Sequence, residues 1–156
     1  MSYNRFIASF SRVPREIFRT NNGPTVRLRA HIGPVRPRGK FDLLTTQDGR
    51  VLPKALTPAQ YEWPNGASLR CNSRMQHWLV RSFKVPDACV YVLREGVDVP
   101  RDLILVHEFA DHYSLQARKE MTVPELEEKI MAFLQGKGEL LGKAEWMKRY
   151  PQPEYD

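Results

Sequence analysis

The chain has 156 residues, of which 42% are hydrophobic, which is the size and composition of one globular domain. No apolar run approaches the roughly 20 residues of a membrane-spanning helix, and the N-terminus lacks the apolar segment and cleavage site of a signal peptide. We therefore expect a single domain over residues 1–156 that acts in the cytoplasm and has no membrane partner. Cys71 and Cys89 suggest neither a disulfide framework nor a metal site.

The positive charge is concentrated in the first third of the chain. Residues 1–50 contain ten Lys or Arg and three Asp or Glu, a net charge of +7, and since the whole chain carries +6, the remainder carries −1. Such a basic surface attracts phosphate groups in a nucleic acid or a dinucleotide, or an acidic partner. A basic surface that meets only solvent explains the same charge equally well.

The N-terminal part predicts mainly β-strands. Residues 5–13 and 16–20 are short segments rich in aromatic and β-branched residues, which is typical of strands. Residues 25–31 alternate between apolar and basic side chains, which predicts a half-buried strand with a basic outer face. The apolar positions are Val26, Leu28 and Ala30. Prolines and glycines at 32–40 predict a loop.

The middle of the chain predicts a hairpin and then a helix. Asp48–Gly49 is a turn signal between two short extended pieces. Residues 74–83 have helical spacing, with Asn72 or Ser73 as a candidate N-cap. The apolar face of this helix is expected to contain Met75, Trp78, Leu79, Ser82 and Phe83.

Three further strands are predicted after this helix. Residues 88–93 and 102–109 are continuous apolar runs, which are typical of buried central strands. Residues 111–116 alternate, with Tyr113 and Leu115 on one face. The opposite face carries His112, Ser114 and Gln116.

The clearest local signal is a helix that begins after Thr122. Thr122 and Glu125 have the spacing of a capping box, and Gly136 is positioned to end the helix. The apolar stripe consists of Leu126, Ile130, Phe133 and Leu134. Residues 136–156 are expected to form a second helix over 139–150 and a tail that frays or packs as an extended arm. Strands followed by helices predict an α+β fold with a mixed or antiparallel sheet.

Several common motifs are missing. The chain has no G-x-G-x-x-G, no P-loop and no G-x-S-x-G. His107 and Glu108 do not form an H-E-x-x-H zinc motif, because the next histidine, His112, lies five residues on in a predicted strand. We therefore predict no metal site. Ser68, His112 and Asp111 can be drawn as a catalytic triad, but nothing in their spacing requires it.

Three segments, taken in order, resemble the ADP-ribosyltransferase fold. They are the strand IFRTNN at 17–22, the small-residue strand start NGASLR at 65–70, and the run from Gly96 to Gln116, GVDVPRDLILV…DHYSLQ. The closest resemblance is to a family of small toxins related to a bacterial type VI secretion effector, which includes fungal homologues. It covers roughly residues 6–134. Each motif is weak alone, and their order and spacing together are more specific.

The resemblance implies a cytotoxic NAD-dependent ADP-ribosyltransferase. The expected fold has split mixed or antiparallel β-sheets flanked by helices, with further helices at the C-terminus. NAD would be the substrate, and ADP-ribose would pass to a protein or nucleic acid in the cytosol. Toxins of this type are commonly neutralised by a cognate immunity or antitoxin protein, so such a partner is expected as well.

The resemblance also implies roles for particular residues. Arg19 would contact a phosphate or ribose of NAD, supported by Asn21 and Asn22. Gly66 and Ala67 would let the nicotinamide ring approach the backbone, and Ser68 would brace the site. The catalytic set would be completed on or beside the third strand by His112, Tyr113 and Gln116.

The third strand departs from the wider superfamily, which often places a glutamate there. Gln116 cannot supply the negative charge that favours an oxocarbenium-like centre. Glu108 lies just before this strand. Either other groups carry the mechanism, or turnover is slow, or the site binds NAD without transferring ADP-ribose.

Two alternatives stay open. Instead of a transferase, the protein would be a non-catalytic toxin or a nucleic-acid-binding module whose basic N-terminal face holds phosphates. That face would contain Arg27, Arg29, Arg36, Arg38 and Lys40, with bases stacked on Tyr61, Trp63 and Trp78. Each site residue also has an ordinary structural explanation. Arg19 can be an exposed strand arginine, residues 66–68 a plain turn, His112 a strand histidine and Tyr113 a core tyrosine.

Overall fold

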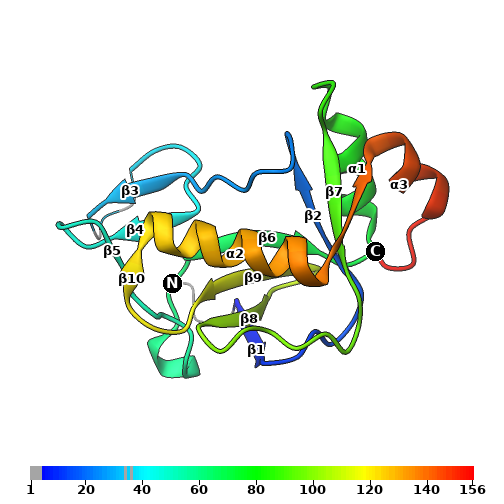
Figure 1. Cartoon of the computed structure of the whole chain (residues 1–156). Helices are drawn as coiled ribbons and strands as arrows, with labels where there is room; N and C mark the ends of the chain where they lie inside the picture. The colour runs from blue at the N-terminus through cyan, green and yellow to red at the C-terminus, as the bar shows by residue number, and fades with distance from the viewer. Residues whose placement is uncertain (1–4, 34, 36) are drawn as a thin grey trace.

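Figure 1 shows the computed structural model, which describes residues 5–33, 35 and 37–156. Within these residues the chain forms a seven-stranded antiparallel sheet, two small sheets and three α-helices, which confirms the predicted α+β fold. The large sheet has the order β1 (Phe6–Phe10), β8 (Leu103–Glu108), β9 (His112–Ala117), β6 (Gly66–Arg70), β2 (Ile17–Asn21), β7 (Cys89–Leu93) and β11 (Glu139–Gly142). The apolar runs β7 and β8 are interior strands, as predicted.

The remaining elements lie around this sheet. The small sheets pair β10 (Met121–Thr122) with β5 (Arg50–Val51), and β3 (Ala30–Ile32) with β4 (Leu43–Thr45). The helices are α1 (Arg74–Ser82), α2 (Val123–Lys137), α3 (Lys143–Arg149) and the short 3-10 helix η1 (Pro58–Gln60). None of the helices in the described residues is long and apolar enough to cross a lipid bilayer.

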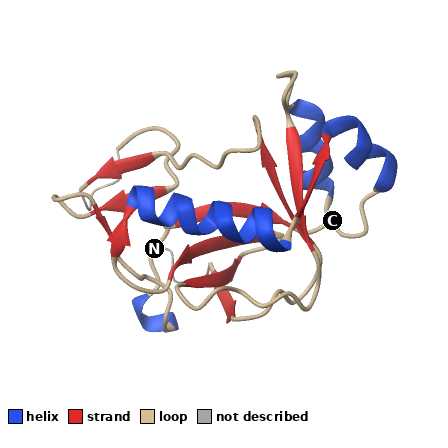
Figure 2. Ribbon diagram, in the orientation of Figure 1, coloured by secondary structure: helices blue, strands red, loops and turns tan. Residues whose placement is uncertain are grey.

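The large sheet is split between β6 and β2. These two strands pair at a single position, Phe18 opposite Arg70, whereas β6 pairs with β9 from Gly66 to Arg70 along its whole length. Figure 2 shows β2, β7 and β11 running steeply across β6, β9 and β8. The split sheet expected from the resemblance is therefore confirmed.

The main hydrophobic core takes side chains from both groups of strands, and a second core lies on β2, β7 and β11. Helix α2 covers the face of β6 and β9 that carries Leu69, Tyr113 and Leu115. Helices α1 and α3 pack on the second group, where the rings of Phe18 and Trp146 meet edge to face at 5.3 Å. A smaller cluster lies between β8 and the segment 52–63. Both cysteines are buried as free thiols.

Helix α2 begins as the sequence predicts and ends later. The Thr122 side chain accepts a bond from the Glu125 amide, and the Glu125 carboxylate accepts one from the Thr122 amide, so the capping box is confirmed. Gly136 does not end the helix; the C-cap is Gly138. A Cβ on Gly138 would lie 2.5 Å from the Leu134 carbonyl oxygen, so this close approach requires glycine.

Helix α1 also begins as predicted, with Ser73 as the N-cap, but the predicted buried face is wrong. The helix buries Gln76, His77 and Val80, whereas Met75 and Trp78 are 48% and 58% exposed. The reason is tertiary, because the sheet and the chain before the helix supply polar partners for this face. Gln76 donates to the Thr20 hydroxyl at 2.9 Å, and the His77 ring bonds the Asn72 side chain at 2.8 Å.

Two other predictions about strands need correction. Residues 25–29 bury Val26 and Leu28 but lie outside the strands, and β3 begins only at Ala30, which is exposed. Their amides bond side chains instead: Leu28 donates to Glu127 at 2.8 Å. The turn at Asp48–Gly49 is present, yet the flanking strands β4 and β5 pair with β3 and β10 rather than with each other.

The C-terminal region differs from the single predicted helix over 139–150. Residues 139–142 form β11, because they extend the sheet beside β7, and the helix α3 starts only at Lys143. The tail packs as an extended arm, one of the two predicted outcomes. The amides of Glu154 and Tyr155 both donate to the Asn72 carbonyl oxygen.

Candidate active site

A cavity of about 920 Å³ opens where the sheet splits, a volume within the ordinary range for small-molecule sites. Its walls come from β2, the segment 22–29, the end of β6 and one side of α1. Both Arg19 and Ser68, which the resemblance singles out, line it. Among the described residues, no group of three His, Cys, Asp or Glu side chains is placed to hold a metal ion.

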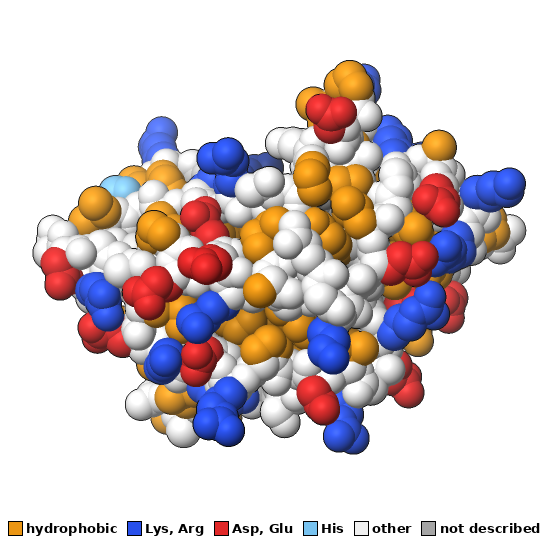
Figure 3. Space-filling model, viewed as in Figure 1, with side chains coloured by type: hydrophobic (Ala, Val, Ile, Leu, Met, Phe, Trp, Pro, Cys, Tyr) orange, Lys and Arg blue, Asp and Glu red, His pale blue; other side chains and the backbone are white. Residues whose placement is uncertain are grey.

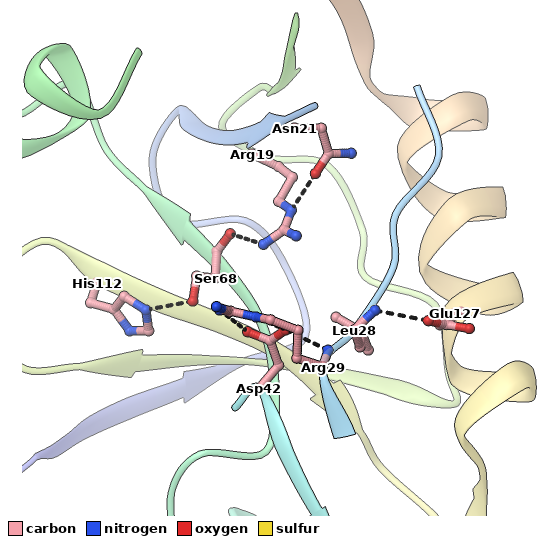
Figure 4. A network of polar contacts seen from close by, with 8 residues as sticks. All are labelled: Arg19, Asn21, Leu28, Arg29, Asp42, Ser68, His112 and Glu127. Atoms are coloured by element: carbon pink, nitrogen blue, oxygen red, sulfur yellow. Dashed lines mark hydrogen bonds and ion pairs between the residues drawn. The ribbon is translucent and has the colours of Figure 1, made fainter. Parts of the chain in front are cut away.

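Arg19 joins the two halves of the split sheet. From β2 it donates through Nη1 to the Ser68 carbonyl oxygen on β6 at 3.0 Å, and through Nε to the Asn21 side-chain oxygen at 2.9 Å (Figure 4). Desolvation by burial lowers the pKa of this guanidinium, although an arginine still stays protonated. Its other N–H donors have no partner among the described residues, so they can serve an anionic ligand.

Asn21 offers a second unused donor in the cavity wall. Because Arg19 holds its Oδ1, its Nδ2 is the free end, and this atom is buried without a partner among the described residues. Figure 4 shows Nδ2 pointing away from Arg19. A buried amide nitrogen without an acceptor is unfavourable, which a ligand oxygen would correct. Asn22 also lines the cavity and is exposed.

Ser68 and His112 form a hydrogen-bonded pair. His112 Nε2 lies 2.9 Å from Ser68 Oγ, and the histidine sits behind the serine without lining the cavity itself (Figure 4). Burial, and then the positive charge of Arg70, lower the pKa of His112 to about 4, so the ring is neutral at pH 7. Asp111 bonds Arg70 and Ser73 rather than His112, so the three residues make no Ser-His-Asp triad.

Tyr113 and Gln116 lie away from the cavity. Tyr113 faces the core under α2, with its ring stacked on that of His107 at 4.3 Å. Gln116 is 0% exposed, and its Nε2 donates to Ser114 Oγ at 3.0 Å. The alternation predicted for β9 is therefore confirmed, but of its three predicted site residues the structure brings only His112 next to Ser68.

Glu108, which ends β8 shortly before β9, does not reach the cavity either. Tyr61 donates its hydroxyl to one Glu108 oxygen at 2.7 Å, and Gln116 Nε2 lies 3.5 Å from the other. Burial raises the pKa of Glu108. The carboxylate thus belongs to a buried polar cluster beneath the segment 52–63.

The small residues Gly66 and Ala67 have a packing explanation. A Cβ on Gly66 would lie 2.3 Å from the Leu115 carbonyl oxygen on β9, so β6 can approach this closely only with glycine. Ala67 is buried in the core. Neither residue lines the cavity, and their contact with a nicotinamide ring stays a prediction.

The basic part of the chain forms one wall of the cavity. The exposed cations Arg27, Arg29 and Lys40 line it, and Figure 3 shows Lys and Arg side chains gathered over the segment between β2 and β3. Asp42, the acidic residue in the described lining, pairs with Arg29 at 3.1 Å. Arg38 is exposed and lies outside the lining, and Arg36 lies outside the described residues.

One wall of the cavity, which Gln76, Leu79 and Phe83 of the α1 region provide, was not predicted from the sequence. Gln76 went unnoticed because a polar residue was expected on the solvent side of α1. The sequence did contain a signal for it, the spacing of Gln76 from Leu79 and Phe83. Residues three and seven positions apart lie on the same side of a helix.

The sequence profile of the Tse2 ADP-ribosyltransferase toxins matches residues 15–146. The chain belongs to this family. The match starts just before β2 and ends in α3, so it contains both strands of the split, the cavity and β9. This confirms the resemblance seen in the sequence and makes the protein a toxin of the ADP-ribosyltransferase type. No curated protein matches the chain significantly.

Proposed function

We propose that this Tse2-family protein is a cytotoxic enzyme that cleaves NAD and transfers ADP-ribose to a macromolecule in the cytosol. The observation that carries the proposal is the position of Arg19. It bridges the two halves of the split sheet and lines a cavity that other cations line as well, in a chain of an ADP-ribosyltransferase family.

The lining fits a dinucleotide with two phosphates. The free N–H groups of Arg19 can bind phosphate oxygens in a forked geometry, which suits guanidinium better than ammonium. Arg27 and Lys40 add positive charge, and neither has an ion-pair partner among the described residues. The unpartnered Nδ2 of Asn21 matches a phosphate, ribose or carboxamide oxygen.

The transfer exchanges one bond at C1′ of the nicotinamide ribose. The C1′–N bond breaks, and its electron pair leaves with nicotinamide, which becomes neutral. An oxygen or nitrogen of the acceptor forms the new bond to C1′, and its proton passes to solvent. The chain's own residues bind and orient NAD so that C1′ faces the acceptor, which is a large part of the catalysis such a site can supply.

Carboxylates in this cavity can give a positively charged transition state little electrostatic stabilisation. Asp42 lines it, but Arg29 binds both of its oxygens, at 3.1 and 3.2 Å. Glu108 is held by Tyr61. A developing positive charge at C1′ therefore meets little free negative charge, and we expect turnover slower than in transferases with a glutamate on the third strand.

The test is nicotinamide release from NAD by wild type, Arg19→Ala and Arg19→Lys. Since Arg19 positions the phosphates, Arg19→Ala should lower kcat/KM about 100-fold, and Arg19→Lys should restore it only partly. Arg101→Ala, which removes an exposed arginine outside the cavity lining, is the matched control and should behave as wild type.

Thermal unfolding of each variant separates loss of the site from loss of the fold. Normal release by a folded Arg19→Ala protein would overturn the assignment of this residue. No release by wild type, with or without cell lysate as acceptor, would overturn the enzymatic proposal. It would favour the alternative of a non-catalytic toxin.

A further inference from the structure

Helix α1 exposes large apolar side chains at the edge of the cavity. Trp78 and Met75 are 58% and 48% exposed, while Gln76 and His77 are buried. A surface helix normally does the opposite, so exposed large apolar groups beside a cavity indicate a contact surface. Of the three aromatic residues predicted to stack on bases, Trp78 is the exposed one. Tyr61 is buried against Glu108, and the Trp63 ring lies under the Arg5 guanidinium at 3.9 Å.

The order of side chains around α1 places Trp78 on the exposed side of the helix, about 100° around from the cavity-lining Leu79. Leu79 and Phe83 line the cavity. At about 100° per residue, Met75 comes next around the helix, followed by Ser82 and then Trp78. Arg74 and Arg81 lie beyond Trp78 on the same exposed side. A molecule that reaches into the cavity along this wall therefore passes over an indole ring flanked by two arginines.

Basic side chains lie on both sides of the cavity, within the lining on one side and on the exposed surface of α1, outside the lining, on the other. Residues 74–84 contain Arg74, Arg81 and Lys84 and no acidic residue. The opposite wall presents Arg27 and Lys40. NAD carries only two phosphates, so it does not use all of these cations, and those on the outer side of α1 lie outside the cavity lining. A longer polyanion that spans both walls would pair with them.

We propose that the acceptor of ADP-ribose is a single-stranded nucleic acid, with a base stacked on Trp78 and its phosphates over the cations of both walls. An exposed aromatic ring between cations is how proteins hold single strands, whose unpaired bases are free to stack. This rests on the proposed function, because it names the acceptor at the same site. An oxygen or nitrogen of a nucleotide attacks C1′ and loses its proton to solvent, while neutral nicotinamide leaves.

Binding tests the surface without NAD. The probes are fluorescein-labelled single-stranded RNA and DNA oligonucleotides of mixed sequence, titrated with wild type, Trp78→Ala and Leu140→Ala. Trp78→Ala should weaken binding about tenfold. Leu140→Ala removes another exposed apolar side chain, 43% exposed, on β11 and should change nothing. If about four phosphates are neutralised, the affinity should fall roughly 50-fold between 50 and 200 mM salt.

Transfer tests the acceptor directly. Cell lysate is incubated with the protein and NAD labelled in the adenylate half, then divided between nuclease and protease treatment. Label that nuclease releases and protease does not supports the proposal. Relative to nicotinamide released in the same sample, Trp78→Ala should lower that label about tenfold.

The outcomes are distinguishable. Nicotinamide release with label that resists nuclease and disappears with protease means a protein acceptor, which overturns this inference and leaves the transferase standing. Absence of oligonucleotide binding, or binding unchanged by Trp78→Ala in a folded protein, also overturns it. No nicotinamide release from wild type overturns the proposed function and this inference together, and any remaining salt-dependent oligonucleotide binding then defines a binding module.

Discussion

The neutral, half-buried state of His112 predicts that acid weakens the fold. Burial lowers the pKa of His112 from its ordinary 6.5 to about 4, and the unfolded chain keeps the ordinary value. Between these two values the unfolded chain binds a proton that the folded chain does not. Protons therefore favour unfolding, so the stability is lost as pH falls below 6.5 and the loss levels off below about 4.

The size of the effect follows from the two pKa values. For a single group with these values, the free energy of unfolding should be about 2 kcal/mol lower at pH 5 than at pH 7. Burial also lowers the pKa of His77, which adds a loss of the same sign. The contribution of His112 is therefore the difference between wild type and His112→Gln, whose amide can still bond Ser68.

The assay is urea unfolding at pH 7 and pH 5, followed by circular dichroism, for both proteins. His112→Gln should lose about 2 kcal/mol less than wild type over this range. Equal losses in the two proteins would refute the reasoning, because they would mean that His112 titrates in the folded state as it does in the unfolded chain. A greater loss of stability in His112→Gln would mean that His112 opposes the effect of acid, the opposite of the expected sign.

Three smaller predictions concern local structure, each read by thermal or urea unfolding. Thr122→Ala removes the bonds of the Thr122 hydroxyl to the Glu125 amide and carboxylate, while the Thr122 amide keeps its own bond, and should cost about 1 kcal/mol; no change would mean that the side-chain cap does not stabilise α2. Gly66→Ala forces a Cβ to 2.3 Å from the Leu115 carbonyl oxygen and should cost roughly 3 kcal/mol or prevent folding. In Gly136→Ala the added Cβ meets nothing within 4 Å, and residue 136 lies inside α2, so the free energy of unfolding should rise by about 0.5–1 kcal/mol. A decrease would contradict a helix that continues through this position.

Local structure could be predicted from the sequence wherever the interacting residues lie close together in the chain. The start of α2 was predictable because Thr122 and Glu125 satisfy each other three residues apart. The interior strands β7 and β8 were predictable because an uninterrupted apolar run has to be covered on both faces. Where partners are distant, local pattern failed: α1 buries Gln76 because Thr20, 56 positions earlier, bonds it.

The sequence by itself determined the α+β composition, the basic first third and, through three ordered motifs, the toxin family. Only the tertiary structure decided which of the proposed residues meet. Arg19 reaches Ser68 across a separation of 49 residues, because β2 and β6 diverge from a single paired position. The same strand geometry places His112 behind Ser68, while Tyr113 turns into the core, since neighbouring residues of a strand face opposite sides of the sheet. Side-chain types can propose a site, but the twist and pairing of strands determine which side chains share a cavity.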